Sequence, residues 1–130
     1  MRYLKKDLPS FMRMRELKKY EADGKLHYIE TSNGVAGFYV LDGSMFKCLF
    51  VDPQFRGQGI ASQIIKNESY KQQITIATTK RMCGIKRIIM RLGFVNTGVV
   101  VQGKQSQLEI WASQTEEKVF NAWLNNLIMI

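Results

Sequence analysis

The sequence is most informative at residues 51–61, which read Val51-Asp52-Pro53-Gln54-Phe55-Arg56-Gly57-Gln58-Gly59-Ile60-Ala61. A β-rich apolar run comes before this stretch. Apolar residues recur at helical spacing after it, at Ile60, Ala61, Ile64 and Ile65. We therefore expect a strand, a glycine loop and a helix in that order. Gly57 and Gly59 allow the sharp backbone turn that such a loop needs.

Outward from this loop, the sequence patterns predict a mixed α/β domain. Before the loop, a short basic helix starts near Asp7-Leu8-Pro9-Ser10, and three strands follow at 26–31, 35–41 and 44–51. After it, we expect a helix to about Tyr70, a buried strand at 74–79, a helix that Gly93 ends, and a hairpin of 94–102 with 107–112. The fold class is a single-domain α/β sheet, with an antiparallel meander, two βα pairs and a closing hairpin, flanked by helices.

The C-terminal stretch carries one more amphipathic pattern. A capping-box spacing at 113–116 precedes apolar residues that share one side, namely Phe120, Trp123, Leu124, Leu127 and Ile130. We expect an extra C-terminal helix that packs on the core. The same apolar side could instead join two copies of the chain as a homodimer.

Length, charge and cysteine content limit the classes of protein. The chain has 130 residues, enough for one compact domain. It carries 19 Lys and Arg against 11 Asp and Glu, a formal net charge of +8 that attracts anionic ligands. The isolated Cys48 and Cys83 indicate neither disulfides nor zinc, so we expect no metal. We also expect no membrane span and no secretory leader, and hence a cytoplasmic protein.

The glycine loop predicts an anion-binding site. Its successive N–H groups and those of the first helical turn can point at one spot, and Arg56 beside them could neutralise a phosphate oxygen. The Gly-Lys-Ser/Thr end of a Walker loop is missing, and Ser62 stands where a dinucleotide motif needs its third glycine. A nucleoside triphosphate or NAD is therefore disfavoured. A purely structural tight loop and a small phosphate-binding domain in which only the glycine loop matters are alternatives.

The stretch from Leu49 to Ala61 resembles the acyl-CoA signature of the Gcn5-related N-acetyltransferase (GNAT) family. That signature has Gln or Arg, two residues, Gly, one residue, and then Gly or Ala, and it is met by Gln54, Gly57 and Gly59. A second stretch, Met90-Arg91-Leu92-Gly93-Phe94, resembles the corner before the sixth strand of that family. Together the two matches span roughly residues 45–100, and the expected element order agrees with the family's fold.

The resemblance implies transfer of an acetyl or similar acyl group from CoA to an amine that attacks directly. The pantetheine arm would pair with the main chain of 49–51, the diphosphate would lie on the N–H groups from Arg56 to Ala61, and N–H groups near Phe50 would stabilise the oxyanion. Acetyl-CoA is the implied co-substrate, without a metal. The implied cofactor-binding residues are Leu49, Phe50, Val51, Arg56, Gly57, Gln58, Gly59, Ile60, Ala61 and Ser62.

Three positions depart from the family pattern. Lys47 stands where many members carry a glutamate base, Ile89 where they carry a tyrosine acid, and Met82 where they carry an asparagine. The catalytic acid and base are therefore unassigned. An alkyl amine is mostly protonated at neutral pH, so the reaction needs a water relay or an acceptor of lower pKa. Substitutes for the missing groups are sought on the neighbouring strands, among His27, Tyr28, Glu30 and Tyr39.

Basic residues suggest the kind of acceptor. Lys80, Arg87 and Arg91 rise from one side of a predicted helix, and the N-terminal stretch adds further positive charge. An ordinary solvated face explains this charge as well as a nucleic-acid or acidic-protein acceptor does. An alternative function is a non-catalytic module of the GNAT fold that acts as a basic adaptor for nucleic acid or a protein partner.

Overall fold

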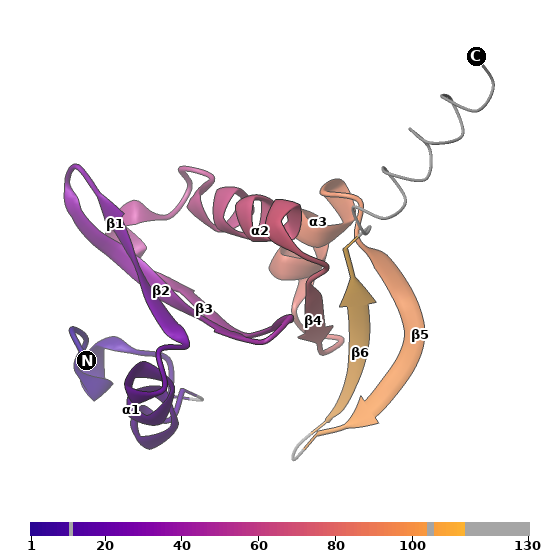
Figure 1. Ribbon diagram of the computed structural model, residues 1–130, viewed down its shortest axis with the longest axis horizontal. Coiled ribbons are helices and arrows are strands. Elements are labelled where there is room, and N and C mark those ends of the chain that lie inside the picture. The colour runs from indigo at the N-terminus through magenta and orange to yellow at the C-terminus, as the bar shows by residue number, and fades with distance from the viewer. Residues whose placement is uncertain (11, 104–105, 114–130) are drawn as a thin grey trace.

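The computed structural model describes residues 1–10, 12–103 and 106–113 and confirms the expected mixed α/β fold (Figure 1). The C-terminal helix expected at Phe120 and Trp123 lies outside the described residues. The helices are α1 (Met14–Ala22), α2 (Ile60–Lys71) and α3 (Cys83–Arg91), with short 3-10 turns at Lys5–Asp7 and Pro53–Phe55. The strands are β1 (Leu26–Thr31), β2 (Gly34–Asp42), β3 (Met45–Val51), β4 (Thr75–Thr78), β5 (Val95–Gln102) and β6 (Gln107–Ala112).

The strands form one sheet in the order β1-β2-β3-β4-β6-β5. The meander β1–β3 is antiparallel, β3 and β4 are parallel, and β6 lies between β4 and the edge strand β5. The meander, the βα connection and the closing hairpin agree with the prediction, because a glycine loop and a helix carry the chain from β3 to a parallel neighbour. The sequence did not predict that β6 lies between β4 and β5. Among the described residues, no helix is long and apolar enough to cross a bilayer.

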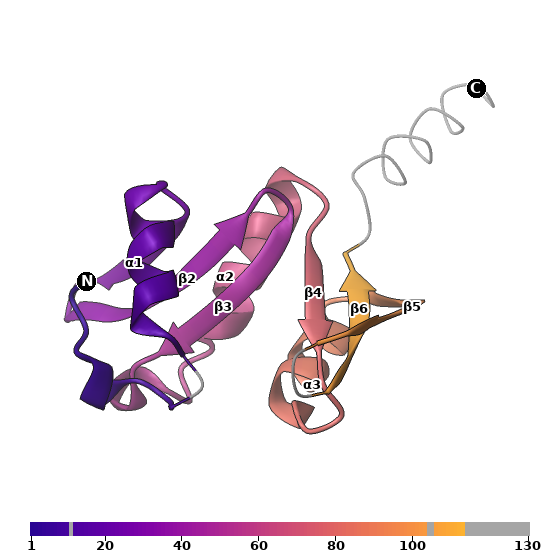
Figure 2. The same ribbon diagram turned by 90° about the horizontal axis from the view of Figure 1, so that it is seen from below.

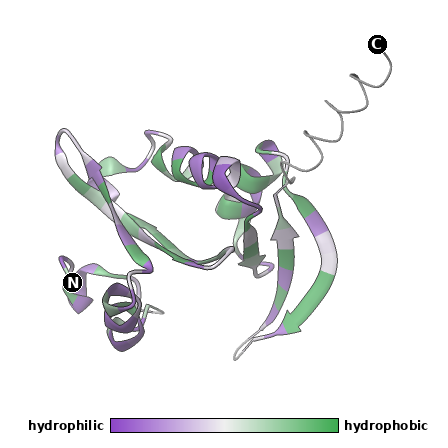
Figure 3. Cartoon of the chain, in the orientation of Figure 1, coloured by the Kyte–Doolittle hydropathy of each residue, from purple (hydrophilic) through white to green (hydrophobic). Residues whose placement is uncertain are grey.

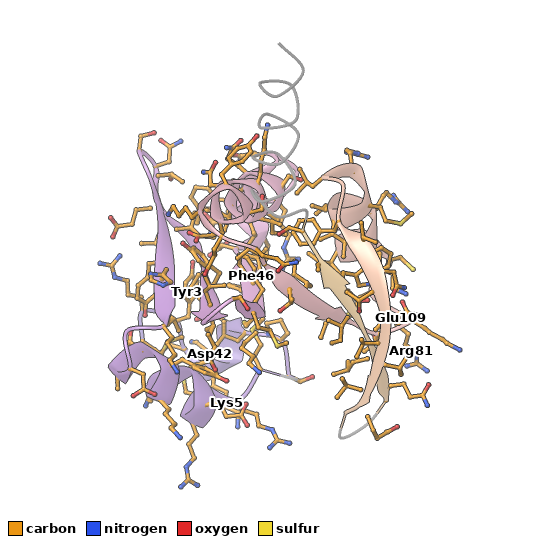
Figure 4. All side chains as sticks on the ribbon, turned by 45° about the vertical axis from the view of Figure 1, so that its right-hand side comes forward. Tyr3, Lys5, Asp42, Phe46, Arg81 and Glu109 are labelled. Atoms are coloured by element: carbon orange, nitrogen blue, oxygen red, sulfur yellow. The ribbon has the colours of Figure 1, made fainter. Side chains whose placement is uncertain are left out.

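Alternating side chains divide the core between the two faces of the sheet. On β2, Phe38 and Val40 face α1, where they join Leu17 and Phe50. Tyr39 and Leu41 face the other way and belong to the cluster under α2 and α3, which contains Phe46, Ile65, Ile74, Ile76, Ile89, Phe94 and Trp111. Phe46 lies in the interior of the molecule, whereas Lys5 and Arg81 lie at its periphery (Figure 4). The two-residue period of the strands thus sets which helices cover which face.

Most element boundaries lie within one residue of the sequence prediction, and the start of the first helix differs most. The helix expected from about Asp7 begins at Met14, because Leu8 before Pro9 is extended (φ −108°, ψ 152°) as residues before proline tend to be. The last hairpin begins at Val95 rather than Phe94, which is buried in the core. Every residue of β5 is exposed, including its valines, and the strand shows a hydrophobic stretch in Figure 3.

A hydrogen bond between the half-buried Tyr39 and the buried Glu68 ties α2 to the meander and predicts a pH-dependent stability. The Tyr39 hydroxyl donates to Glu68 Oε1 at 2.9 Å, and burial together with this bond raises the pKa of Tyr39 to about 12. The folded state therefore holds the phenol proton more tightly, and this stabilisation is lost as the pH rises from about 10 to 12. The free energy of unfolding of Tyr39→Phe, measured in urea, should decline less than that of wild type over this pH range. At neutral pH it should be about 1–2 kcal/mol lower than that of wild type. Tyr70→Phe, at a phenol that is 62% exposed, should behave as wild type.

Candidate active site

The parallel strands β3 and β4 pair only at one end. Met45 pairs with Thr75 and Phe46 with Ile76, and beyond Phe46 the strands diverge (Figure 2). The divergence starts at a β-bulge, since Val40 pairs with Cys48 but Leu41 pairs with Phe46, which leaves Lys47 as the extra residue. A bulge bends its strand and disrupts the ladder. The main chain of 47–51 is therefore free of β4 on that side.

A cavity of about 550 Å³ occupies the opening between the strands, and we call it the main cavity. Its size is typical of ligand sites. The wall combines β3, the glycine loop, the start of α2, one side of β4 and α3. The lining residues are Pro9, Met12, Phe46–Val51, Phe55, Arg56, Gly57, Gly59–Ser62, Ile65, Ile76, Ala77, Met82, Ile85 and Ile88.

The glycine loop holds its turn by local contacts and positive φ angles. Asp52 Oδ1 accepts a hydrogen bond from the Gln54 N–H at 3.0 Å, and Pro53 opens the short 3-10 turn. Gly57 and Gly59 then adopt φ angles of +80° and +76°, which residues with a Cβ adopt only at a cost. A Cβ at either glycine would meet no atom within 4 Å, so the space in front of the loop is open.

The loop and the first turn of α2 present six consecutive N–H groups, from Gly57 to Ser62. Within the described part of the chain, no protein acceptor bonds any of them, and the first paired N–H of the helix is that of Gln63, which donates to the Gly59 carbonyl at 3.0 Å. Unpaired N–H groups at a helix start carry partial positive charge and bind anions. The cradle expected from Arg56 to Ala61 is therefore open from Gly57 onward and extends to Ser62, but the Arg56 N–H is not part of it, because it donates to the Pro53 carbonyl at 3.4 Å.

Arg56 takes a position that the sequence did not predict. Its Nε donates to the Val51 carbonyl at 2.9 Å, at the end of β3. This bond holds the guanidinium between the strand and the cradle, while the remaining N–H groups of the fork are not bonded by any described residue. The side chain thus helps to fix the strand exit as well as adding positive charge to the loop.

The structure brings together nearly all the residues that the sequence assigned to cofactor binding. Leu49, Phe50, Val51, Arg56, Gly57, Gly59, Ile60, Ala61 and Ser62 line the main cavity, whereas Gln58 is exposed and does not. The sequence analysis missed Ile85 and Ile88 of α3 as wall residues. Their helical spacing indicated only an apolar face, and a core face and a cavity wall have the same pattern.

The four candidate catalytic residues lie away from the main cavity. Tyr28 donates to Glu21 Oε2 at 2.7 Å on the α1 face, and Glu30 is paired with Arg2 Nη1 at 3.0 Å. Tyr39 is bonded to Glu68, and the exposed His27 stacks on Tyr39 with ring centroids 5.1 Å apart. None of the four lines the cavity.

The positions that depart from the family pattern fall in different environments. Lys47 and Met82 line the main cavity, but Ile89 is fully buried in the core under α3. Cys48 also lines the cavity, and burial raises the pKa of its thiol to about 11. At neutral pH this thiol is protonated, and a protonated thiol is a poor nucleophile.

Comparison with known proteins places this architecture in a family. Residues 5–108 match the family model described as "Acetyltransferase (GNAT) domain". No curated protein matches the sequence. Among solved structures, the fold is similar to a GNAT-family acetyltransferase from Bacillus cereus (TM-score 0.64, 18% identity, 78% of each chain covered). It is also similar to a putative GNAT-family acetyltransferase from Bordetella pertussis (0.61, 14%, 84% of this chain and 80% of that chain).

A chain from the NatC complex bound to Gag peptide and CoA is a third similar structure, with a TM-score of 0.61, 13% identity and 86% of each chain covered. At these identities the structures show a shared fold. The family match itself spans most of the sequence and includes the diverging strands and the glycine cradle. The chain therefore belongs to the GNAT family of acetyltransferases, which use acetyl-CoA to acetylate amines.

Proposed function

We propose that the main cavity binds acetyl-CoA and that an amine attacks the thioester directly. The observation that carries the proposal is the run of six N–H groups that no described residue bonds, beside a strand that has separated from its neighbour. The first feature suits a diphosphate and the second an extended arm with amide groups. The acyl-CoA supplies an activated carbonyl with a thiolate leaving group.

Each part of the site has a defined task in this proposal. The main chain of 49–51 pairs with the pantetheine arm, and the cradle from Gly57 to Ser62 holds the diphosphate, with the Ser62 hydroxyl beside it. Backbone N–H groups near Phe50 stabilise the oxyanion. In the reaction a bond forms between the amine nitrogen and the carbonyl carbon, and the C–S bond breaks. The proton lost by the amine is balanced by the one that the thiolate takes up.

Two observations favour direct attack. The Cys48 thiol is held protonated by burial, which disfavours a covalent acyl-cysteine. No carboxylate or imidazole among the described residues lines the main cavity, so no side chain there is placed as a strong base. The proton must leave through water, or the acceptor must have an amine of lower pKa. The formal net charge of +8 attracts an anionic acceptor, and this class includes nucleic acids and acidic proteins.

Release of CoA thiol from acetyl-CoA, measured with a panel of amines, peptides and oligonucleotides, tests this function. We expect thiol release that depends on an acceptor and saturates with acetyl-CoA. CoA binding without turnover on any acceptor would instead support the adaptor function considered above. A protein whose melting temperature does not change at millimolar CoA would contradict both, and would favour a phosphate site unrelated to CoA.

Arg56 provides a residue-level prediction. Arg56→Gln removes the charge beside the cradle and weakens the bond to the Val51 carbonyl. We expect the Kd for CoA to rise about tenfold, since a hydrogen bond to a charged group contributes about 1.5–3 kcal/mol. Calorimetric titration measures the Kd. Arg87→Gln, at an exposed position of α3 outside the cavity, should leave it unchanged, and equal effects of the two variants would count against a role of Arg56 in binding.

A further inference from the structure

A second cavity adjoins the main cavity on the α1 side of β3. It has a volume of about 230 Å³, and we call it the α1 cavity. Its wall is formed by α1, the segment before it, β3 and Met82, which precedes α3. The residues that line it are Met12, Arg13, Glu16, Leu17, Tyr20, Lys47, Cys48, Leu49 and Met82.

The two cavities meet at the bulge of β3. Met12, Lys47, Cys48, Leu49 and Met82 line both of them. The glycine cradle and the helices α2 and α3 border only the main cavity, whereas Arg13, Glu16 and Tyr20 border only the α1 cavity. A molecule in the α1 cavity would therefore approach an arm lying along 49–51 from the side opposite the cradle. It would reach the arm without displacing the diphosphate.

The α1 cavity carries charges of both signs. Arg13 and Lys47 are positive, and Glu16 is the sole carboxylate among the described residues that line either cavity. Arg13 Nη1 lies 3.9 Å from Glu16 Oε1, and both side chains are about 60% exposed, so this ion pair is weak. Lys47 makes no ion pair within 4.0 Å with any residue that the structure describes. Leu17 and Tyr20 supply apolar surface beside the charges.

This arrangement matches a zwitterion better than a polyamine or a phosphate. A polycation would meet two positive side chains against one carboxylate, and a dianionic phosphate would meet Glu16 as a like charge. An ammonium beside Glu16 and a carboxylate beside Lys47 and Arg13 would each find an opposite charge. The volume suits a single amino-acid unit rather than a folded partner.

Resting on the proposed function, we infer that the α1 cavity is the acceptor site and takes an amine that carries a carboxylate a few bonds away. Glu16 holds the ammonium before it loses its proton, and Lys47 at the bulge, with Arg13, holds the carboxylate. The amine then attacks the thioester carbonyl as described above, with its proton passing to water. A free amino acid and the N-terminal acidic residue of a peptide both present this pair of groups.

The first experiment compares acceptors. Thiol release is measured with free α-amino acids and with the amines that differ from them only by loss of the carboxylate, together with a peptide beginning with Asp, spermidine and an oligoadenylate. We expect kcat/KM to be at least tenfold higher for the amino acid or the acidic peptide than for the decarboxylated amine. The ratio of kcat/KM between the amino acid and the peptide shows whether the acceptor is a free amino acid or a peptide N-terminus. Equal or better use of the decarboxylated amine, spermidine or the oligonucleotide would overturn the inference.

The second experiment assigns the selectivity to the cavity. Lys47→Met keeps most of the side-chain volume and removes the charge. It should raise the KM for the acceptor about tenfold and reduce the discrimination between the amino acid and its decarboxylated amine. The Kd for CoA should change less. Glu16→Gln should also raise the acceptor KM. Arg15→Gln, on the same helix but outside both cavities, should match wild type. Discrimination that is unchanged in Lys47→Met would overturn the role of this residue.

A binding measurement separates this inference from the proposed function. Failure of the proposed function appears as no thiol release with any acceptor. The acceptor site is tested independently by the melting temperature of the CoA-bound protein. Addition of 10 mM of the amino acid should raise this temperature further in wild type and in Arg15→Gln, but not in Lys47→Met. No such rise in wild type, for either the amino acid or the acidic peptide, would overturn the site whatever the turnover shows.

Discussion

Gly59→Asp should abolish the thermal stabilisation that CoA gives to the wild-type protein. At a ligand concentration a hundred times Kd, binding stabilises the folded state by about 2.7 kcal/mol, which is a readily measured shift in melting temperature. Gly59 lies at the centre of the six unpaired N–H groups, and a Cβ there would point into open space in front of them. An aspartate would therefore place a negative charge and added bulk where a diphosphate must lie.

Two control variants separate the charge from the backbone cost. Gly59→Asn adds nearly the same volume at the same positive φ without the charge, and it should retain part of the CoA response. Gly98→Asp lies at a φ of +79°, close to that of Gly59, and also meets no atom within 4 Å, but it is on β5 away from the cradle. It should respond to CoA as wild type does. A Gly59→Asp protein that keeps the full shift would refute the cradle as the diphosphate site.

Gly37→Ala should cause the largest loss of stability among single glycine substitutions at described positions. A Cβ at Gly37 would lie 1.9 Å from the backbone oxygen of Phe50, and the residue has a φ of +154°. Both atoms belong to paired strands, since Gly37 is opposite Val51. The clash cannot be relieved by a side-chain rotation, so β2 and β3 must move apart. We expect the free energy of unfolding to fall by about 3 kcal/mol or more, measured in urea.

The matched control lies on the same strand. Gly34 has a φ of +112°, but a Cβ there would meet no atom within 4 Å. Gly34→Ala should therefore lose only the cost of the backbone conformation, about 1 kcal/mol. Equal losses in the two variants would show that the close approach of β2 and β3 at Phe50 does not decide the effect.

Local sequence was sufficient to predict the glycine cradle and the order of the elements. Gly57 and Gly59 adopt the positive φ angles that only glycine adopts easily, and the N–H groups after them are unpaired because every helix begins with unpaired donors. The two-residue and 3.6-residue periods of the apolar residues determine the strands and helices. The start of α1 was predicted too early in the chain, because Pro9 keeps Leu8 extended.

The catalytic side chains could not be predicted in the same way. Tyr28, Glu30 and Tyr39 lie on strands next to the site in sequence order, yet each is bonded to a partner outside the sheet, namely Glu21, Arg2 and Glu68. Alternation along a strand shows that neighbours face opposite sides, but it does not show which side holds the cavity. Similarly, no pattern in the sequence distinguishes Ile88, on the cavity wall, from Ile89, in the core.

The sequence by itself therefore determined the parts whose geometry is set by a few adjacent residues: the strand, the loop with its donors, and the helix that follows. Only the tertiary structure decided where β3 separates from β4 and that Lys47 is the bulged residue. It also decided that Arg13, which precedes α1, and Glu16 and Tyr20 of α1 line a second cavity together with Lys47. These features depend on the register between strands and on the packing of segments far apart in the chain. Both are set by the whole core, and no short stretch of sequence specifies them.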